Sequence, residues 1–471
     1  MRDLLRTWLK AHPDFEQEAR RRAKKALIFG GVAFVILAIT GAASFALIWL
    51  TAVALALYVP PWGLLRYGRW VVVLGVLALA VLYPFYQANL FEIPIFGGFP
   101  SVDTGVTMLI FIMMALGLNI VVGYAGLLDL GYVAFYAMGA YTAAWFASQH
   151  FSGKNIHLGA VGINPDSPGI HISIWIVLFI AAIFTAMVGV IIGFPTLRLR
   201  GDYLAIVTLG FGEIMPQIAR NGDHLFGHNL TNGPQGINPI DPPGFGSGLH
   251  NAVGLPNDYL TFNARFLGTT ISNVQLFFWT ALVLVLFTVF CSVRLRDSRL
   301  GRAWIAIRED ETAAAAMGVP LMRTKTWAYA AGAFFGGIAG AYYASFKSGT
   351  FPDDFFFNIS IFILCMVILG GMGNIWGVIL GGGFLAYLNQ EGLGNIGGWL
   401  NQHFSGQSDS PDKWFTIWST DIDVPLYQFG IFGVILVLVM LFKPEGLIPS
   451  SRRKAEFREG VSDEPLYDVQ K

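Results

Sequence analysis

Long apolar runs without charges dominate the pattern of hydrophobic and polar positions in this chain. Residues 26–59 form a 34-residue run with no charged residue, and 172–194 and 274–293 are further long apolar stretches. A helix rises about 1.5 Å per residue, so about 20 residues span the roughly 30 Å of a bilayer core. The runs do not alternate between apolar and polar residues, which argues against a transmembrane β-barrel. The pattern predicts an all-α polytopic membrane protein.

The apolar segments predict about ten core transmembrane helices, and the N-terminal run adds a membrane hairpin. Several of the ten are shorter than a full span, so we expect some to be tilted, broken or re-entrant. They lie near 70–87, 105–122, 127–148, 172–194, 203–219, 270–292, 326–346, 357–371, 373–390 and 425–442.

Lys and Arg are unevenly distributed between the loops, and basic residues mark the cytoplasmic side. Residues 1–25 and the loop 294–325 are rich in them, whereas 221–269 and 391–424 each contain one. Ten crossings starting from a cytoplasmic "RYGR" at 66–69 place every basic-rich loop inside and every basic-poor loop outside. We therefore expect both termini to be cytoplasmic and the protein to be a multi-pass inner-membrane protein.

These assignments divide the chain into four parts. Residues 1–25 form a basic cytoplasmic segment, and 26–69 form an N-terminal membrane extension. The extension crosses an even number of times, either as a hairpin turning near "TGAAS" or as a shallow insertion. Residues 70–442 form the transmembrane domain, and 443–471 form a cytoplasmic tail.

The composition fits this class. Hydrophobic residues make up 55% of the chain and charged residues 13%, about half the share of a soluble domain. The net charge is zero, so nothing indicates a nucleic-acid partner, and membrane lipid is the expected surrounding. Two glycine series have the four-residue spacing that lets helices approach closely in lipid. They are predicted helix-packing positions: Gly332, Gly336 and Gly340, and Gly373, Gly377 and Gly381.

Motifs for catalysis or cofactor binding are weak. No Walker A pattern is present, and "GLGNIG" at 392–397 follows a membrane helix rather than a strand, so we interpret it as a loop. His224 and His228 are four residues apart without an HExxH motif, which favours an exposed loop over a metal site. We expect no catalytic residue, no metal site and no cofactor bound by this chain.

Polar residues inside spanning segments are expensive and usually face the bundle interior. Asp129 and Glu213 are the two best pathway or gating candidates, and Asn119 and Thr208 add polar groups in nearby glycine-rich stretches. For Glu213, a pathway role and a structural bond to a broken helix are equally open. For Asp129, the favoured interpretation is a cap on a helix that starts after "GYAG".

A charged island interrupts the apolar pattern at 298–319, "SRLGRAWIAIREDETAAAAMGV". Apolar and charged positions alternate with helical spacing, so we predict one short amphipathic helix over 299–318 that lies outside the bilayer. Gly318 suits the helix end, with Pro320 just beyond. A solvated connecting loop without a partner is the alternative.

Several stretches together resemble the LivM type of branched-chain amino-acid permeases from bacterial ABC importers. They are "GLNIVVGYAGLLDLGYVAFYAMGAYTAA" (117–144), "FPTLRLRGDYLAIVTLGFGEI" (194–214), "LGRAWIAIREDETAAAAMGV" (300–319), "VILGGMGNIWG" (367–377) and "FKPEGLI" (442–448). The resemblance extends over roughly 100 to 450 in matching order. It implies a permease subunit, not an enzyme, that carries leucine, isoleucine and valine.

The resemblance also implies partners. They are a shorter homologous permease, two cytoplasmic ATPases that hold ATP and Mg, and a periplasmic or lipid-anchored binding protein. Such permeases contact their ATPases through a loop often written EAAxxxG; with its glycine at Gly318, the acidic residue is displaced to Glu311, so the match is partial. The residues expected to couple to the ATPases are Gly301, Arg302, Ala303, Arg308, Glu309, Glu311, Ala313, Ala314 and Gly318.

Other functions remain open at this stage. Within ABC permeases, urea, short amides or a broader range of amino acids are alternative substrates. An ion-coupled secondary transporter would use membrane carboxylates and an inverted repeat, but no clear internal repeat is visible. A polytopic membrane enzyme lacks a convergent catalytic set in this sequence.

Overall fold

The computed structural model describes the part of the chain that holds most of the apolar helices. The described residues are 77, 79–87, 98–164, 166–198, 202–224, 227–246, 256–259, 265–266, 269–405, 420–443 and 446–448. The predicted basic segment 1–25, the membrane extension 26–69 and nearly all of the tail 443–471 lie outside them.

The chain divides into two compact units. The smaller comprises Met1–Val102 and Gly398–Ile417, and the larger comprises Asp103–Gly397 and Trp418–Lys471. In the smaller unit, residues 79–86 are helical, and the Tyr83 hydroxyl donates to the Pro100 carbonyl at 2.6 Å.

The larger unit is built from apolar helices. Four helical stretches of the described chain are long and apolar enough to cross a membrane: Val102–Tyr124, Ile174–Thr196, Asn273–Asp297 and Val424–Phe442. The predicted class is confirmed, but the count of ten core helices is not. The principal helices are α5 (Val102–Leu118), α6 (Val133–Phe146), α7 (Ile174–Thr196), α8 (Asp202–Asn221), α10 (Asn273–Asp297), α13 (Leu321–Phe346), α14 (Phe357–Gly370), α15 (Ile375–Tyr387) and α17 (Gln428–Phe442).

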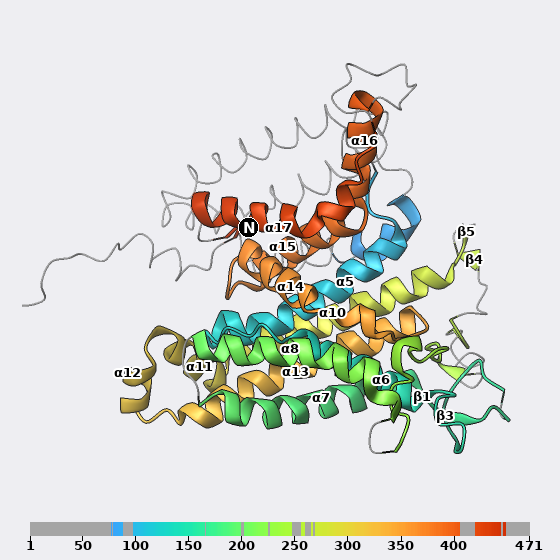
Figure 1. Cartoon of the computed structure of the whole chain (residues 1–471), viewed down its shortest axis with the longest axis horizontal. Coiled ribbons are helices and arrows are strands. Elements are labelled where there is room, and N and C mark those ends of the chain that lie inside the picture. The colour runs from blue at the N-terminus through green and yellow to red at the C-terminus, as the bar shows by residue number, and fades with distance from the viewer. Residues whose placement is uncertain are drawn as a thin grey trace, which may run out of the picture. The chain divides into compact units, whose positions relative to one another are not determined.

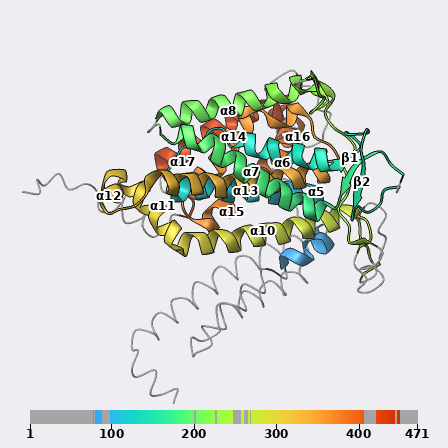
Figure 2. The same cartoon turned by 90° about the horizontal axis from the view of Figure 1, so that it is seen from below.

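Helix α13 is central to the larger unit. It packs along α6 and α7, and the three helices run side by side (Figures 1 and 2). Close approach depends on glycine: a Cβ on Gly340 would meet the Tyr136 carbonyl of α6, and one on Gly337 would meet the Thr185 side chain of α7. Small residues at these crossings bring the backbones into contact.

Two predicted helix boundaries are wrong. The helix expected over 127–148 begins only at Val133, because α5 continues into a π-helical turn, η2 (Asn119–Tyr124), and residues 125–132 are not helical. The loop expected at "GLGNIG" is helical instead, since α15 continues through the π-helical η6 (Leu388–Gly392) into α16 (Leu393–Phe404). Hydropathy reports burial and says little about where an apolar backbone leaves the α conformation.

Short strands lie in a segment expected to form loops. β1 (Ala147–Ser148), β2 (Asn155–Leu158) and β3 (Gly169–Ile172) form a sheet in the order β1-β3-β2, with β2 parallel and β1 antiparallel to β3. A separate antiparallel pair joins β4 (Arg265–Phe266) and β5 (Thr269–Thr270). This sheet end of the larger unit lies opposite the end that carries α11 (Arg299–Glu309) and α12 (Glu311–Ala316) (Figure 1).

Candidate functional site

The charged island forms two helices rather than the single helix predicted over 299–318. The break falls at Asp310, whose backbone is extended between α11 and α12. Its carboxylate accepts hydrogen bonds from the Thr312 N–H at 2.8 Å, the Ala313 N–H at 3.0 Å and the Thr312 hydroxyl at 2.6 Å. An aspartate that satisfies the free N–H groups of a helix start is a strong N-cap. Asp310 therefore ends one helix and begins the next.

The same hydrogen bonds stabilise the ionised form of the Asp310 carboxyl. The hydrogen bond from the Thr312 hydroxyl, followed by the two backbone N–H groups, lowers the pKa of the Asp310 carboxyl below its usual 3.8. The group is fully exposed, and its negative charge faces the positive end of the α12 dipole.

The end of α12 follows the prediction for Gly318. Its φ is +85°, a left-handed conformation that favours glycine, and the Val319 N–H donates to the Ala314 carbonyl at 3.0 Å. The N-terminal corner is equally tight: a Cβ on Gly301 would collide with the carbonyls of Leu295 and Arg296 in α10. The two predicted glycines therefore set the bends that bound this helical pair.

One face of the pair is fastened to the membrane helices. Trp304 is 1% exposed, and its indole N–H donates to the Thr324 carbonyl of α13 at 2.8 Å. The Lys325 Nζ lies 2.7 Å from Glu311 Oε1, and the Lys325 side chain is 4% exposed. Ala314 is buried on the same side. Lys325 is thus the buried partner of the predicted coupling residue Glu311, a pairing that the sequence pattern did not predict.

Arg308 also faces the membrane helices. Its guanidinium donates to the Gly123 carbonyl in η2, and its side chain crosses Gly126, where an added Cβ would lie 2.7 Å from Arg308 Cγ. Gly126 has a φ of +69°, so a glycine is required there for both reasons. This predicted coupling residue thus contacts η2, the π-helical continuation of α5, within the chain.

Asn119 connects the same turn to a distant one. It is 1% exposed, and its Oδ1 accepts a hydrogen bond at 2.8 Å from the Gly373 N–H, in the turn between α14 and α15. Gly373 has a φ of +82° and precedes α15, so it is not the first helical glycine of a tandem GxxxG series as predicted. Gly377 and Gly381 do lie in α15, where an added Cβ would collide with the backbone of Gly370.

The opposite face of the helical pair is exposed. Met317 is 85% exposed at the end of α12, an unusual position for a large apolar side chain at the edge of a charged loop. The other exposed side chains on α11 and α12 are those of Arg299, Arg302, Glu309, Thr312, Ala313, Ala315 and Ala316. Of these, Arg302, Glu309 and Ala313 are predicted coupling positions, and a further predicted position, Ala303, is half-buried. We call this surface the α12 face.

Asp129 lies in the non-helical segment between η2 and α6. It is 1% exposed, its Oδ1 accepts from the Gly131 N–H at 2.9 Å, and its Oδ2 has no hydrogen-bond partner among the described residues. The capping bond therefore serves the turn before the helix, because the Val133 N–H at the start of α6 donates to the Ser360 hydroxyl oxygen at 2.9 Å.

Thr208 supports the same segment. Its hydroxyl oxygen accepts from the Leu130 N–H at 3.0 Å and donates to the Ala205 carbonyl at 3.0 Å within α8. A Cβ on Gly131 would lie 2.2 Å from the Thr208 carbonyl. Thr208 and Asp129 thus satisfy backbone groups of a broken helix at membrane depth, where unpaired groups are costly.

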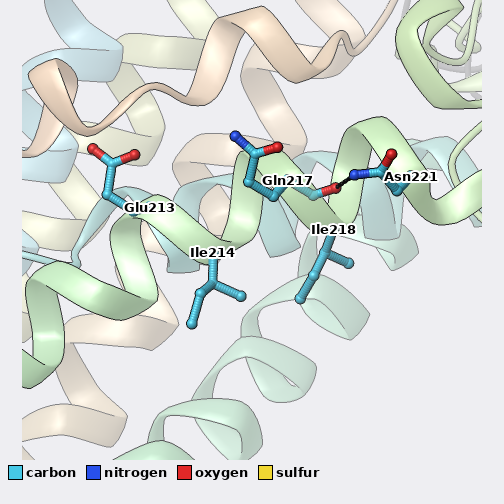
Figure 3. Close-up of a pocket in the computed structure, with 5 residues that line it drawn as sticks. All are labelled: Glu213, Ile214, Gln217, Ile218 and Asn221. Carbon is cyan, nitrogen blue, oxygen red and sulfur yellow. Dashed lines mark hydrogen bonds between the residues drawn. The ribbon is translucent and has the colours of Figure 1, made fainter.

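Glu213 lies on the other face of α8. It is exposed, and in the described part of the chain its carboxylate takes part in no hydrogen bond or ion pair. A shallow pocket of about 480 Å³ is lined by Glu213, Ile214, Gln217, Ile218 and Asn221. Figure 3 shows the polar tips of Glu213, Gln217 and Asn221 on one side of the helix and the two isoleucines on the other. The structure therefore brings Asp129 and Thr208 together and separates Glu213 from them.

No group of three His, Cys, Asp or Glu side chains able to hold a metal occurs among the described residues. His224 is exposed and lies 3.7 Å from Asp223 at the sheet end.

The sequence relatives agree among themselves. Residues 102–440 match the family described as branched-chain amino acid transport system / permease component. The chain is 34% identical over 391 residues to the high-affinity branched-chain amino acid transport system permease protein LivM of Escherichia coli, covering 82% of this chain and 77% of the relative. The Salmonella typhimurium LivM protein is likewise 34% identical over 391 residues, covering 82% of this chain and 76% of the relative.

A third relative is less similar in sequence. The chain is 25% identical over 354 residues to the probable branched-chain amino acid transport permease protein LivM of Methanocaldococcus jannaschii, covering 72% of this chain and 90% of the relative. No solved structure matches the chain. The family match spans most of the chain and includes every feature described above in the larger unit, from η2 to α17; this chain belongs to the family of branched-chain amino acid transport permease components.

Proposed function

We propose that this chain is the membrane-spanning permease subunit of an ABC importer that carries leucine, isoleucine and valine across the inner membrane. Its family and its LivM relatives support the substrate class and the importer. The apolar helices support a multi-pass membrane protein. Both termini are proposed to be cytoplasmic, from the distribution of Lys and Arg.

The observation that carries this proposal is the two-sided α11–α12 pair. Its inner face is fastened by Trp304, Glu311 and Arg308 to α13 and η2, so a push on the pair moves membrane helices. Its α12 face is exposed, carries charge and ends in the projecting Met317. A protein without its own nucleotide site needs such a contact with the subunit that hydrolyses ATP.

The coupling residues therefore have two proposed tasks. Gly301, Arg308, Glu311 and Ala314 hold the pair on the membrane domain, and Gly318 ends it. Arg302, Ala303, Glu309 and Ala313 belong to the surface offered to the ATPase. The proposed partners are two cytoplasmic ATPases with their ATP and Mg, a shorter homologous permease and a periplasmic or lipid-anchored binding protein. This chain is proposed to bind no cofactor.

The test is uptake by the reconstituted complex. With all subunits in proteoliposomes and leucine-loaded binding protein outside, we expect labelled leucine to accumulate only when ATP is enclosed with the ATPases. Uptake that continues without ATP and follows an ion gradient would instead identify a secondary transporter. A panel with urea and unrelated amino acids defines the substrate range.

A paired variant tests the α12 face. Ala313→Trp together with Met317→Asp should release the ATPases during purification, because the first blocks and the second recharges the exposed surface. Ile156→Asp is the control, since Ile156 is 48% exposed on β2 at the sheet end and should leave ATPase retention unchanged. Retention of the ATPases by the double variant with full uptake would contradict the docking assignment.

A further inference from the structure

Helix α8 differs from its neighbour α7 in the side chains that it turns outward. Its inner face is small and buried, with Leu204, Ala205, Thr208 and Ala219 packed on the rest of the larger unit. Its outer face carries aromatic, aliphatic and polar side chains: Tyr203, Ile206, Glu213, Ile214, Gln217, Ile218 and Asn221.

The polar members of that face follow one line. Glu213, Gln217 and Asn221 are spaced four residues apart, which places them one above another along the helix. The Asn221 Nδ2 donates to the Gln217 backbone carbonyl at 2.9 Å, so the Gln217 side-chain amide is free of that bond and points outward (Figure 3). We call Glu213, Gln217 and Asn221 the α8 polar line.

The depth of Glu213 excludes lipid as its surroundings. Glu213 is the twelfth of the 20 residues of α8, roughly 12–17 Å from either end at 1.5 Å per residue. The helix packs against α6, α7 and α14, so its middle lies at the depth of the apolar bundle. A carboxylate without a partner in hydrocarbon is costly, and such groups face protein or water.

Other helices show what a lipid-facing surface looks like in this chain. The exposed side chains of α7 include Phe179, Ile183, Met187 and Ile191, all apolar. The middle of α8 is equally exposed but carries a carboxylate and two amides. The contrast indicates that the α8 face is covered by water and protein rather than by acyl chains.

The apolar side chains on this face of α8 can select for an aliphatic group on the transported molecule. Ile214 and Ile218 border the polar pocket, and the same two side chains also line an apolar cavity of about 360 Å³ between α6, α7 and α8. Although their side chains leave the helix on different sides (Figure 3), the carboxylate, the two amides and the two isoleucines line one pocket along two turns of α8. These are the groups that complement an ammonium, a carboxylate and an aliphatic side chain.

We propose that the outward face of α8 lines the route of the transported molecule and contacts a zwitterionic amino acid with an aliphatic side chain. Glu213 receives the ammonium group, the amide N–H groups of Gln217 and Asn221 donate to the carboxylate, and Ile214 and Ile218 contact the side chain. The proposal rests on the permease function above, and the partner permease closes the route from the other side.

Accessibility to water tests the location. In a background with Cys291→Ser and Cys365→Ala, single cysteines are placed at 217 and 221 on the α8 polar line and at 183 and 187 on α7. With the full complex in proteoliposomes, a membrane-impermeant sulfonated maleimide should label 217 and 221 and leave 183 and 187 unlabelled. Leucine-loaded binding protein with ATP should slow labelling at 217 and 221. Labelling at 217 and 221 no faster than at 183 and 187 would overturn the route, whether lipid or a dry protein contact covers α8.

Transport by charge variants tests the contact. Glu213→Gln should lower leucine uptake about tenfold or more, the effect of losing a hydrogen bond to a charged group, while stimulated ATP hydrolysis persists. Asp223→Asn, an exposed carboxylate just beyond α8, is the matched control and should transport normally. Normal uptake by Glu213→Gln would overturn the assigned contact.

The two proposals fail in different ways. If the wild-type complex shows no ATP-driven leucine uptake, the permease function itself is wrong. If the wild type transports but the α8 cysteines are not labelled and Glu213→Gln transports normally, only the α8 route is wrong.

Discussion

The ion pair between Lys325 and Glu311 gives a quantitative test of how firmly α12 is held on α13. The two charged atoms lie 2.7 Å apart, and the side chains are 4% and 30% exposed. Glu311→Gln leaves a buried ammonium without its counter-charge, whereas Lys325→Met leaves a carboxylate that water already reaches. The two single variants should therefore differ, and the double variant should recover much of the loss.

The magnitude follows from burial. Removing one partner of a fully buried pair costs about 3–5 kcal/mol, and solvent screening at the half-exposed Glu311 reduces this to about 2–3 kcal/mol. Since about 1.4 kcal/mol is a factor of ten, the local opening of α12 should become about 30 to 150 times more frequent in Glu311→Gln. For Lys325→Met we expect about 1 kcal/mol, or roughly fivefold.

Hydrogen exchange of peptides that cover 311–319 measures that opening directly. The control is Asp297→Asn, which breaks the exposed pair with Arg296 in the same loop, where the side chains are 39% and 62% exposed, and should leave α12 protection unchanged. Equal protection in Glu311→Gln and wild type, or a double variant no better than Glu311→Gln, would refute the idea that a buried charge fastens α12.

Three further predictions address packing, capping and coupling. Gly340→Leu should lower the free energy of unfolding by about 3 kcal/mol, because the new side chain meets a backbone carbonyl of α6. Thermal unfolding in detergent measures this loss, and Gly394→Ala, where an added Cβ meets open space, is the control. Asp310→Ala should raise hydrogen exchange in α12. Hydrogen bonding lowers the pKa of Asp310 in the folded protein. The contribution of the ionised carboxylate to α12 stability is therefore complete above about pH 4 and is lost only as the pH falls through that lowered pKa. Wild-type protection of α12 should accordingly stay flat from about pH 8 to 5. Arg308→Met should keep the ATPases bound but reduce leucine uptake several-fold relative to ATP hydrolysed, since the contact with η2 is lost; an unchanged ratio of uptake to hydrolysis would contradict this role.

The apolar runs predicted several helices closely because continuous apolar sequence records burial in lipid. Helix α7, expected over 172–194, is Ile174–Thr196, and α10, expected over 270–292, is Asn273–Asp297. The start of α6 was missed because residues 127–132 are nearly as apolar as the helix that follows. What breaks the helix there is the left-handed Gly126 and the close contact at Gly131, which depend on Arg308 and Thr208 from distant segments.

The location of the candidate site could be predicted from the sequence, but its side-chain contacts could not. The charged island identified the α11–α12 pair, yet its charges alone did not show that Arg308 turns inward or that Lys325 is buried. The single helix expected over 299–318 neglects the N-cap signal at Asp310, "DET" followed by alanines, which predicts the break. Glu213 was equally ambiguous, because position in a spanning segment does not specify which face of the helix it occupies.

The hydrogen bond from Val133 to Ser360 has a consequence for how the protein is made. It joins groups 227 residues apart, and Leu130 similarly depends on Thr208, 78 residues later. A ribosome inserting this chain therefore releases the non-helical stretch before α6 into the membrane long before its last partner is synthesised. We expect that stretch to remain open to quality-control proteases until α14 has entered the bilayer. Nascent chains truncated before residue 360 should accordingly be degraded faster than chains truncated after α14, even though both contain α6 in full.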